Sequence, residues 1–163
     1  MAIASGGTKL WPERRMGYYM RFISTDQQPI TAPELRAALI AADPAYDIEV
    51  DDSVVTIRHS GDTIAQVEIN VPGDGLFEEE RDELVEFVTD APGEQDEKAR
   101  VLDALARLRA IVAAQVLFGT GNTDDTLLRL DPLWTWLLQN RTGLLQADGE
   151  GYYDADGLVV QID

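Results

Sequence analysis

Apolar and polar residues alternate in four segments of the first half of the chain, with the period of two that a half-buried β-strand produces. Asp51-Asp52 and Ser60-Gly61-Asp62 separate the last three segments, and both links are typical of tight hairpin turns. The sequence therefore predicts a four-stranded, mainly antiparallel sheet whose strands cover residues 18–23, 46–50, 53–59 and 63–71.

The same alternation assigns the two faces of residues 46–71. One face is apolar and carries side chains such as Ile48, Val55 and Val67. The other face carries polar side chains, and antiparallel sheets commonly keep one face dry and one wet. The residues expected on the wet face are Asp47, Glu49, Thr56, Arg58, Gln66, Glu68 and Asn70.

Helical periodicity and capping signals alternate with these strands. Thr31 and Glu34 form a capping box for a helix that ends at Ala42, and Asp74 is placed to cap a second helix. Three to five helices are expected, packed on one face of the sheet, followed by a C-terminal hairpin of short strands. The remaining predicted helices cover residues 95–118, 124–130 and 131–141, and the short strands fall within 144–162.

The organisation of the chain is that of one α+β domain over residues 16–163. Residues 1–15 lack periodicity and contain Gly6-Gly7, so they are expected to form a disordered leader. Because the first strand pattern begins just after Met16, translation starting at Met16 is an alternative for the native protein.

Charge and composition narrow the classes of function. The 163 residues include 30 acidic and 13 basic ones, for a net charge of −17, which disfavours direct binding to nucleic acid phosphates. The absence of cysteine excludes disulfides, thiolate nucleophiles and Cys-type zinc sites. No apolar run is long enough for a membrane span and no signal-peptide core is present, so a soluble cytoplasmic protein without membrane contact is expected.

The acidic residues concentrate in the middle of the chain, where residues 41–100 hold 18 acidic and 4 basic side chains. Like charges at i and i+4 on the helix after Asp74 repel one another. The alternatives are a surface for cations or a basic partner and a solvated face that keeps the protein soluble. Trp136 lies about 200° around its helix from Trp134, so both are buried only if the helix is covered on two sides. Core packing of both is expected, and exposure of one as an anchor for a partner is the alternative. The candidate partner-binding residues are Glu49, Glu68, Glu79, Asp82, Glu83, Glu86 and Trp136.

Other motifs point to structure more than to chemistry. His59, the single histidine, closes a strand beside Asp62 and is interpreted as a residue that packs or hydrogen-bonds at the margin of the sheet. Residues 154–157, Asp-Ala-Asp-Gly, resemble part of a calcium loop, but Tyr152 occupies the position of the first carboxylate, so a tight turn fits better. The sequence predicts no catalytic, cofactor-binding or metal-binding residues and no cofactor.

Two main hypotheses for function follow. The first is a non-enzymatic interaction module that presents an acidic surface to a basic protein, a profile similar to that of small acidic bacterial inhibitors such as immunity proteins. The second is an enzyme, a hydrolase in which carboxylates bind a divalent metal ion. A small-molecule-binding domain is a third alternative. A homodimer that buries an exposed Trp136 or part of residues 110–118 is a further alternative for the assembly.

Overall fold

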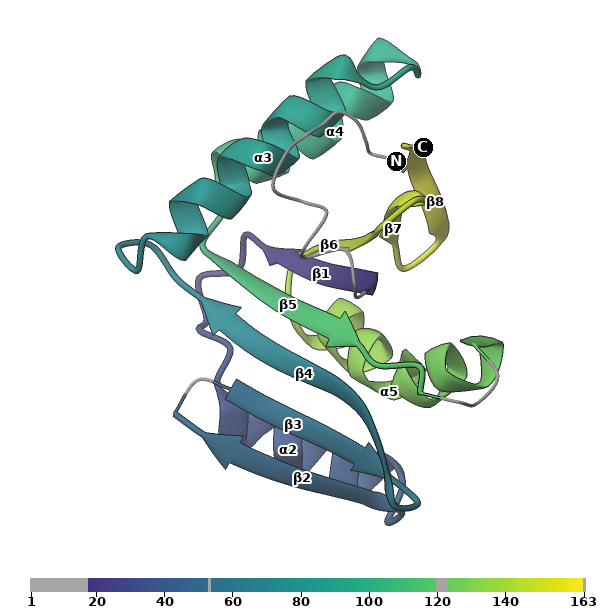
Figure 1. The fold of residues 1–163 in the computed structure, drawn as a ribbon. Coiled ribbons are helices and arrows are strands. Elements are labelled where there is room, and N and C mark those ends of the chain that lie inside the picture. The colour runs from purple at the N-terminus through teal and green to yellow at the C-terminus, as the bar shows by residue number, and fades with distance from the viewer. Residues whose placement is uncertain (1–17, 53, 120–122, 163) are drawn as a thin grey trace.

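The computed structural model describes residues 18–52, 54–119 and 123–162, and Figure 1 draws the elements they form. The leader expected at residues 1–15 lies outside the described residues. Four helices and eight strands are present in the described part of the chain. The helices are α2 (Ala32–Ala42), α3 (Leu76–Asp90), α4 (Gln95–Ala106) and α5 (Thr123–Asn140).

All eight strands belong to one antiparallel sheet with the order β2-β3-β4-β5-β1-β6-β7-β8. The prediction of a four-stranded sheet was therefore wrong. The four predicted strands exist, but the sheet also contains one strand from the middle of the chain and three from its C-terminal part. The strands are β1 (Tyr18–Ser24), β2 (Tyr46–Asp51), β3 (Val54–His59), β4 (Asp62–Asn70), β5 (Ala110–Val116), β6 (Gly143–Ala147), β7 (Gly151–Asp154) and β8 (Gly157–Gln161).

The strand that the sequence analysis missed is β5, which was predicted as the second half of a helix over residues 95–118. Instead α4 ends at Ala106, and β5 is inserted between β4 and β1. Nearly every residue of β5 is buried, as expected for a central strand covered on both faces. Such an apolar run carries no period that distinguishes a strand from a buried helix. The burial of this segment was predicted correctly, but its conformation was not.

Helices cover both faces of the sheet, which corrects the prediction that they pack on one face only. In Figure 1 strands β2 and β3 lie in front of α2, while α3 and α4 lie across the other end of the sheet. Helices α2 and α5 bury Leu39 and Leu133 in one core with Phe22 and Ile57. Helices α3 and α4 pack against the opposite face in a second core. That second core contains Ile23, Phe77, Leu84, Val88, Val101, Leu105, Ile111, Tyr152 and Val160.

The residues predicted to cap α2 and α3 make hydrogen bonds with the first turns of these helices. The backbone N–H of Thr31 donates to Glu34 at 3.0 Å, and the N–H of Glu34 donates back to the Thr31 hydroxyl at 3.4 Å, which completes the capping box. Asp74 accepts from the N–H of Phe77 at 2.7 Å in the first turn of α3. These bonds satisfy backbone donors that the first turn of a helix leaves free.

The C-terminal part of the chain differs from the expectation in two respects. One continuous helix, α5 (Thr123–Asn140), contains Pro132 and replaces the two helices predicted over residues 124–130 and 131–141. The tail forms three strands, β6, β7 and β8, which make a meander in place of a single hairpin. Strand β6 pairs with β1, so this meander extends the same sheet.

Candidate functional site

The sheet has an uncovered polar area on the side where α3 and α4 lie. These helices pack over one end of the sheet (Figure 1), while the polar side chains of β2, of β3 and of β4 up to Glu68 stay exposed or half-buried. We call this area the open face. It comprises Asp47, Glu49, Asp51, Thr56, Arg58, Gln66 and Glu68. The prediction of the wet face is thus confirmed except at Asn70, which is buried because its side-chain amide is covered by Glu80 of α3.

Strand register brings the open-face residues together in rows across the sheet. Glu49 lies opposite Thr56, which in turn lies opposite Gln66. Asp47 lies opposite Arg58, whose guanidinium also reaches Glu49 at 3.3 Å. Arg58 is 35% exposed and Glu49 is 64% exposed, so the attraction between them is weakened by water.

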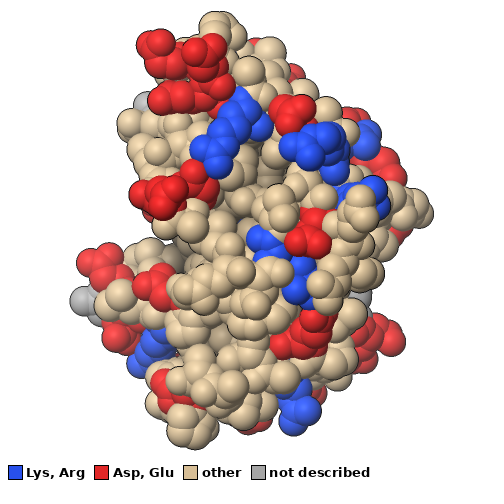
Figure 2. Space-filling model, turned by 180° about the vertical axis from the view of Figure 1, so that it is seen from behind, with Lys and Arg blue, Asp and Glu red and all other residues tan. Residues whose placement is uncertain are grey.

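The open face is therefore dominated by carboxylates. It contains the acidic residues Asp47, Glu49, Asp51 and Glu68 and one basic residue, Arg58. On the opposite side of the sheet, seen in Figure 2, acidic side chains form separate groups among Lys and Arg and broad uncharged areas.

The acidic residues of α3 lie on the same side of the sheet as the open face. Glu79, Asp82 and Glu86 are exposed, and Glu83 is half-buried. Most of the candidate partner-binding residues therefore share one side of the sheet. Trp136 does not belong with them, because it lies on α5 and packs against the core of the opposite side.

Helix α3 is fixed to the sheet by an arginine that the sequence analysis did not single out. Arg21 of β1 is 3% exposed, and its guanidinium contacts the carboxylate of Glu80 on α3 and that of Asp148 at 3.0 Å. Glu80 also accepts from the side-chain amide of Asn70 at 3.3 Å. Burial alone would lower the pKa of Arg21, but the carboxylates of Asp148 and Glu80 raise it, so Arg21 is charged.

A buried hydroxyl lies beside this cluster. Tyr152 is 1% exposed, and its hydroxyl has no hydrogen-bond partner among the described residues. Burial raises its pKa, while the nearby Arg21 acts in the opposite direction. Tyr152 therefore remains protonated at neutral pH. The cluster of Arg21, Glu80 and Asp148 is paired within itself, which identifies it as a structural ion-pair network.

His59 lies at the end of β3, at the margin of the sheet. Its Nε2 atom is 2.9 Å from the carboxylate of Asp43, and its ring meets the ring of Tyr46 edge-on at 4.8 Å. The hydrogen bond to His59, with a second one from the Ala45 backbone, lowers the pKa of Asp43. Ser60 is 3.5 Å from the other ring nitrogen but lies on an exposed turn. These contacts are those of a residue that joins the turn after α2 to the end of the sheet.

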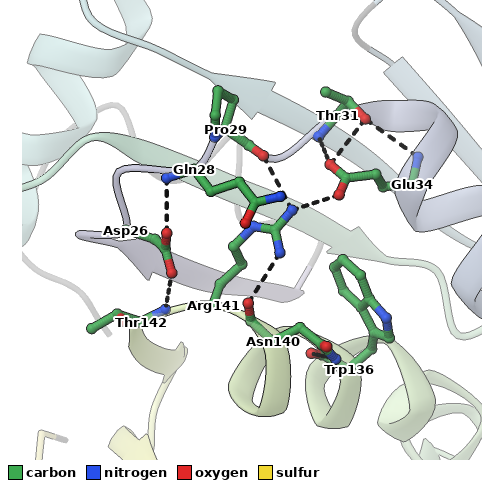
Figure 3. A network of polar contacts seen from close by, with 9 residues as sticks. All are labelled: Asp26, Gln28, Pro29, Thr31, Glu34, Trp136, Asn140, Arg141 and Thr142. Atoms are coloured by element: carbon green, nitrogen blue, oxygen red, sulfur yellow. Dashed lines mark hydrogen bonds and ion pairs between the residues drawn. The ribbon is translucent and has the colours of Figure 1, made fainter.

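Trp136 is half-buried, and Figure 3 shows its surroundings. The guanidinium of Arg141 lies 5.3 Å from the centre of the Trp136 ring, donates to Glu34 at 2.5 Å and donates to the Pro29 carbonyl at 3.3 Å. Asp26 accepts from the backbone N–H of Thr142 at 2.8 Å. The network joins the chain between β1 and α2 to the end of α5. Trp136 takes part in it through its ring, which packs against the Arg141 guanidinium.

The Asp-Gly segment at residues 154–157 forms the tight turn that joins β7 to β8. The Asp154 carboxylate accepts from the backbone N–H groups of Asp156 at 2.8 Å and Gly157 at 3.1 Å, and it pairs with Arg100 at 2.9 Å. Across the residues that the structure describes, no three His, Asp or Glu side chains are grouped so that they could hold a metal ion.

Comparisons with protein-family models, with curated proteins and with solved structures returned no match for this chain. None of the helices in the described ranges has the length and apolar character that crossing a bilayer requires.

Proposed function

We propose that this protein is a non-enzymatic interaction module whose acidic side binds a basic protein surface. The observation that supports this most directly is the composition of the open face, where Asp47, Glu49, Asp51 and Glu68 accompany a single basic side chain, Arg58. The exposed acidic residues of α3 extend the same side of the molecule.

The arrangement of these carboxylates favours a partner of opposite charge. Asp47, Glu49 and Asp51 are alternate residues of one strand, so their side chains lie on the same face of the sheet. Like charges so placed repel one another, and a partner that supplies Lys or Arg relieves that repulsion. Complementary charge also speeds the encounter of the two proteins and makes it sensitive to salt.

The same proposal holds that the protein is soluble and acts in the cytoplasm. In this proposal Trp136 has a structural role, because the contact of Trp136 with Arg141 and its packing against the α2/α5 core already account for its position. The proposal also excludes Trp136 from the binding surface, although the sequence suggested it as an anchor.

The test compares two triple variants that remove the same number of charges. One variant, Glu49→Gln/Asp51→Asn/Glu68→Gln, changes the open face. The other, Glu94→Gln/Asp96→Asn/Glu97→Gln, changes exposed carboxylates at the start of α4, which lie outside the proposed binding surface. A fluorescein-labelled oligo-arginine peptide serves as the basic probe, and its binding is followed by fluorescence anisotropy at low and high salt.

We expect the open-face variant to weaken binding at low salt by about fivefold or more, which corresponds to about 1 kcal/mol, and the other variant to change it much less. High salt should reduce the difference, because exposed charges are screened over about 10 Å at 0.1 M ionic strength. Equal losses in the two variants would show that only net charge matters and would contradict the proposal.

A further inference from the structure

Strand β2 is an edge of the sheet, and no other strand of the described residues lies beside its outer side. The N–H of Ser60 donates to the carbonyl of Ala45 at 3.1 Å, so the backbone polar groups of Ala45 point toward β3. Because this direction alternates along an antiparallel strand, Ile48 and Val50 direct their N–H and C=O groups outward. An exposed row of this kind can pair with another strand.

An apolar groove lies beside this edge, between β2 and α2. It has a volume of about 670 Å³ and is lined by Pro33, Ala37, Ile40, Ile48 and Val50, with Arg36 also at its wall. Ile40 is 40% exposed and Val50 is 37% exposed. A strand added to β2 would therefore place every second side chain against apolar surface.

The other face of the same edge is acidic. Asp47, Glu49 and Asp51 alternate with the apolar residues of β2 and belong to the open face. Since successive side chains of a strand point to opposite faces, a strand added to β2 would direct its remaining side chains toward these carboxylates. The edge thus offers an apolar face and an acidic face to alternate residues of one segment.

Charge distinguishes between a second copy of this chain and another partner. If β2 paired with the β2 strand of a second copy in antiparallel fashion, the acidic residues of both copies would face one another across the new pair. Like charges directly opposite each other destabilise a sheet. A segment with Lys or Arg at those positions would be attracted instead.

We propose that β2 accepts an extended segment of a partner protein in which apolar residues alternate with Lys or Arg. The segment pairs with the backbone of Ile48 and Val50, inserts its apolar side chains into the groove beside Ile40, and places its basic side chains over Asp47, Glu49 and Asp51. This inference deepens the proposed function, on which it rests, by naming the site and the chemistry of the partner.

The other edge of the sheet provides an internal comparison. Strand β8 has five residues, one fewer than β2, and its register with β7 shifts between Tyr152 and Tyr153. Irregular pairing of this kind makes an edge a poorer template for a further strand. The exposed Leu158 of β8 is therefore a suitable control position for changes made at β2.

The experiment uses a labelled heptapeptide of alternating Lys and Val as the probe and the full chain as the receptor. A second peptide of the same sequence carries N-methyl groups on alternate backbone nitrogens, which block strand pairing and keep every charge. We expect the unmodified peptide to bind, and we expect the affinity of the N-methylated peptide to be lower by about tenfold or more. Because this comparison leaves the protein unchanged, it does not depend on whether a variant folds.

Two variants locate the site. Ile40→Lys places a charge in the groove and should weaken binding of the unmodified peptide by about tenfold, while Leu158→Lys, made on the other edge, should leave it within about twofold. Amide chemical shifts should move in β2 and α2. Urea denaturation of both variants verifies that they are folded.

The outcomes separate this inference from the proposed function. If both peptides bind equally and the shifts map to β4 and α3, the acidic side binds basic chains but strand addition at β2 is refuted. If neither this probe nor oligo-arginine binds, both proposals fail. If the protein alone doubles its mass in light scattering and Ile40→Lys abolishes the doubling, the occupant is a second copy, and the proposed partner is refuted.

Discussion

The guanidinium of Arg21 lies 3.0 Å from the carboxylate of Asp148, and 4% of the Arg21 side chain is exposed. The same guanidinium contacts Glu80, so one residue of β1 joins the turn after β6 to helix α3. Replacing Arg21 with Met would leave two carboxylates without their counter-charge. We expect a loss of about 3–5 kcal/mol in the free energy of unfolding, measured by urea denaturation.

The matched control for this prediction is Arg107→Met. Arg107 also pairs with a carboxylate, that of Asp103 at 2.8 Å, but both side chains are 63% exposed. An exposed pair at i and i+4 contributes about 0.3–0.5 kcal/mol. Similar losses in Arg21→Met and Arg107→Met would contradict the structural role assigned to the buried network.

Lys98 provides a second test of a buried charge. Its Nζ donates to the carbonyls of Thr89 at 3.0 Å and Ala91 at 2.6 Å, at the end of α3, and the residue is 8% exposed. Lys98→Met keeps the packing of the stem but leaves these carbonyls without their donor. We expect a loss of about 2 kcal/mol in stability, because hydrogen bonds to charged groups are worth about 1.5–3 kcal/mol.

Amide hydrogen exchange checks where that loss acts. Exchange in the last turn of α3 should accelerate in Lys98→Met under native conditions, while exchange in α2, on the other side of the sheet, should change only with global stability. Unchanged exchange at the end of α3 would mean that Lys98 does not hold this turn.

Two glycines near the C-terminus differ in the space around them. A Cβ atom at Gly151 would lie 2.1 Å from the carbonyl oxygen of Val160, and its φ is +147°. At Gly149 φ is +74°, but a Cβ atom would meet nothing within 4 Å. We expect Gly151→Ala to destabilise the protein by about 2 kcal/mol or more and Gly149→Ala by about 1 kcal/mol, measured by urea denaturation.

Acid should destabilise the network around Arg141. Backbone hydrogen bonds from Gln28 and Thr142 lower the pKa of Asp26. Partial burial would raise the pKa of Glu34, but hydrogen bonds from the Thr31 backbone and from Arg141 outweigh it, so that pKa is also lowered. Carboxylates with a lowered pKa stabilise the fold above their unfolded pKa, which is about 4.

This contribution to stability is lost as the pH falls through the lowered, folded-state pKa values. The urea midpoint should therefore fall steadily as the pH decreases from about 5 to about 2. The variant Asp26→Asn/Glu34→Gln removes two of the titrating groups, so its midpoint should depend less on pH in this range. An equally steep dependence in the variant would assign the acid effect to other carboxylates.

The sequence predicted elements that local signals define. Short hairpin links and clear alternation were sufficient for β2, β3 and β4, and the capping box at Thr31 placed α2. Strand β5 was missed because Ala110–Val116 contains one polar residue, Gln115, too few to set a period of two. The distribution of helices over both faces was missed because the apolar stripe of a helix does not specify which face of a sheet it covers.

The sequence also predicted part of the candidate site, namely the side-chain directions on the open face, but not the features that depend on packing. Alternation placed Glu49 and Glu68 on the wet face correctly, because side-chain direction follows directly from strand register. The cluster of Arg21 and Asp148 was missed, since the two residues are 127 positions apart and only the pairing of β1 with β6 brings them together. The groove beside β2 depends on how α2 packs, which no local pattern encodes.

The position of β5 has a consequence for the order of assembly during synthesis. Among the described strands, β5 lies between β1 and β4 and pairs with both, which links β1 to the β2-β3-β4 meander. A nascent chain that has left the ribosome only as far as Ala106 therefore holds the β2-β3-β4 meander and the single strand β1, whose sheet neighbours β5 and β6 both follow in the sequence. Strand β5 is made after both of its neighbours, so β1 and the meander can join one sheet only once β5 has emerged.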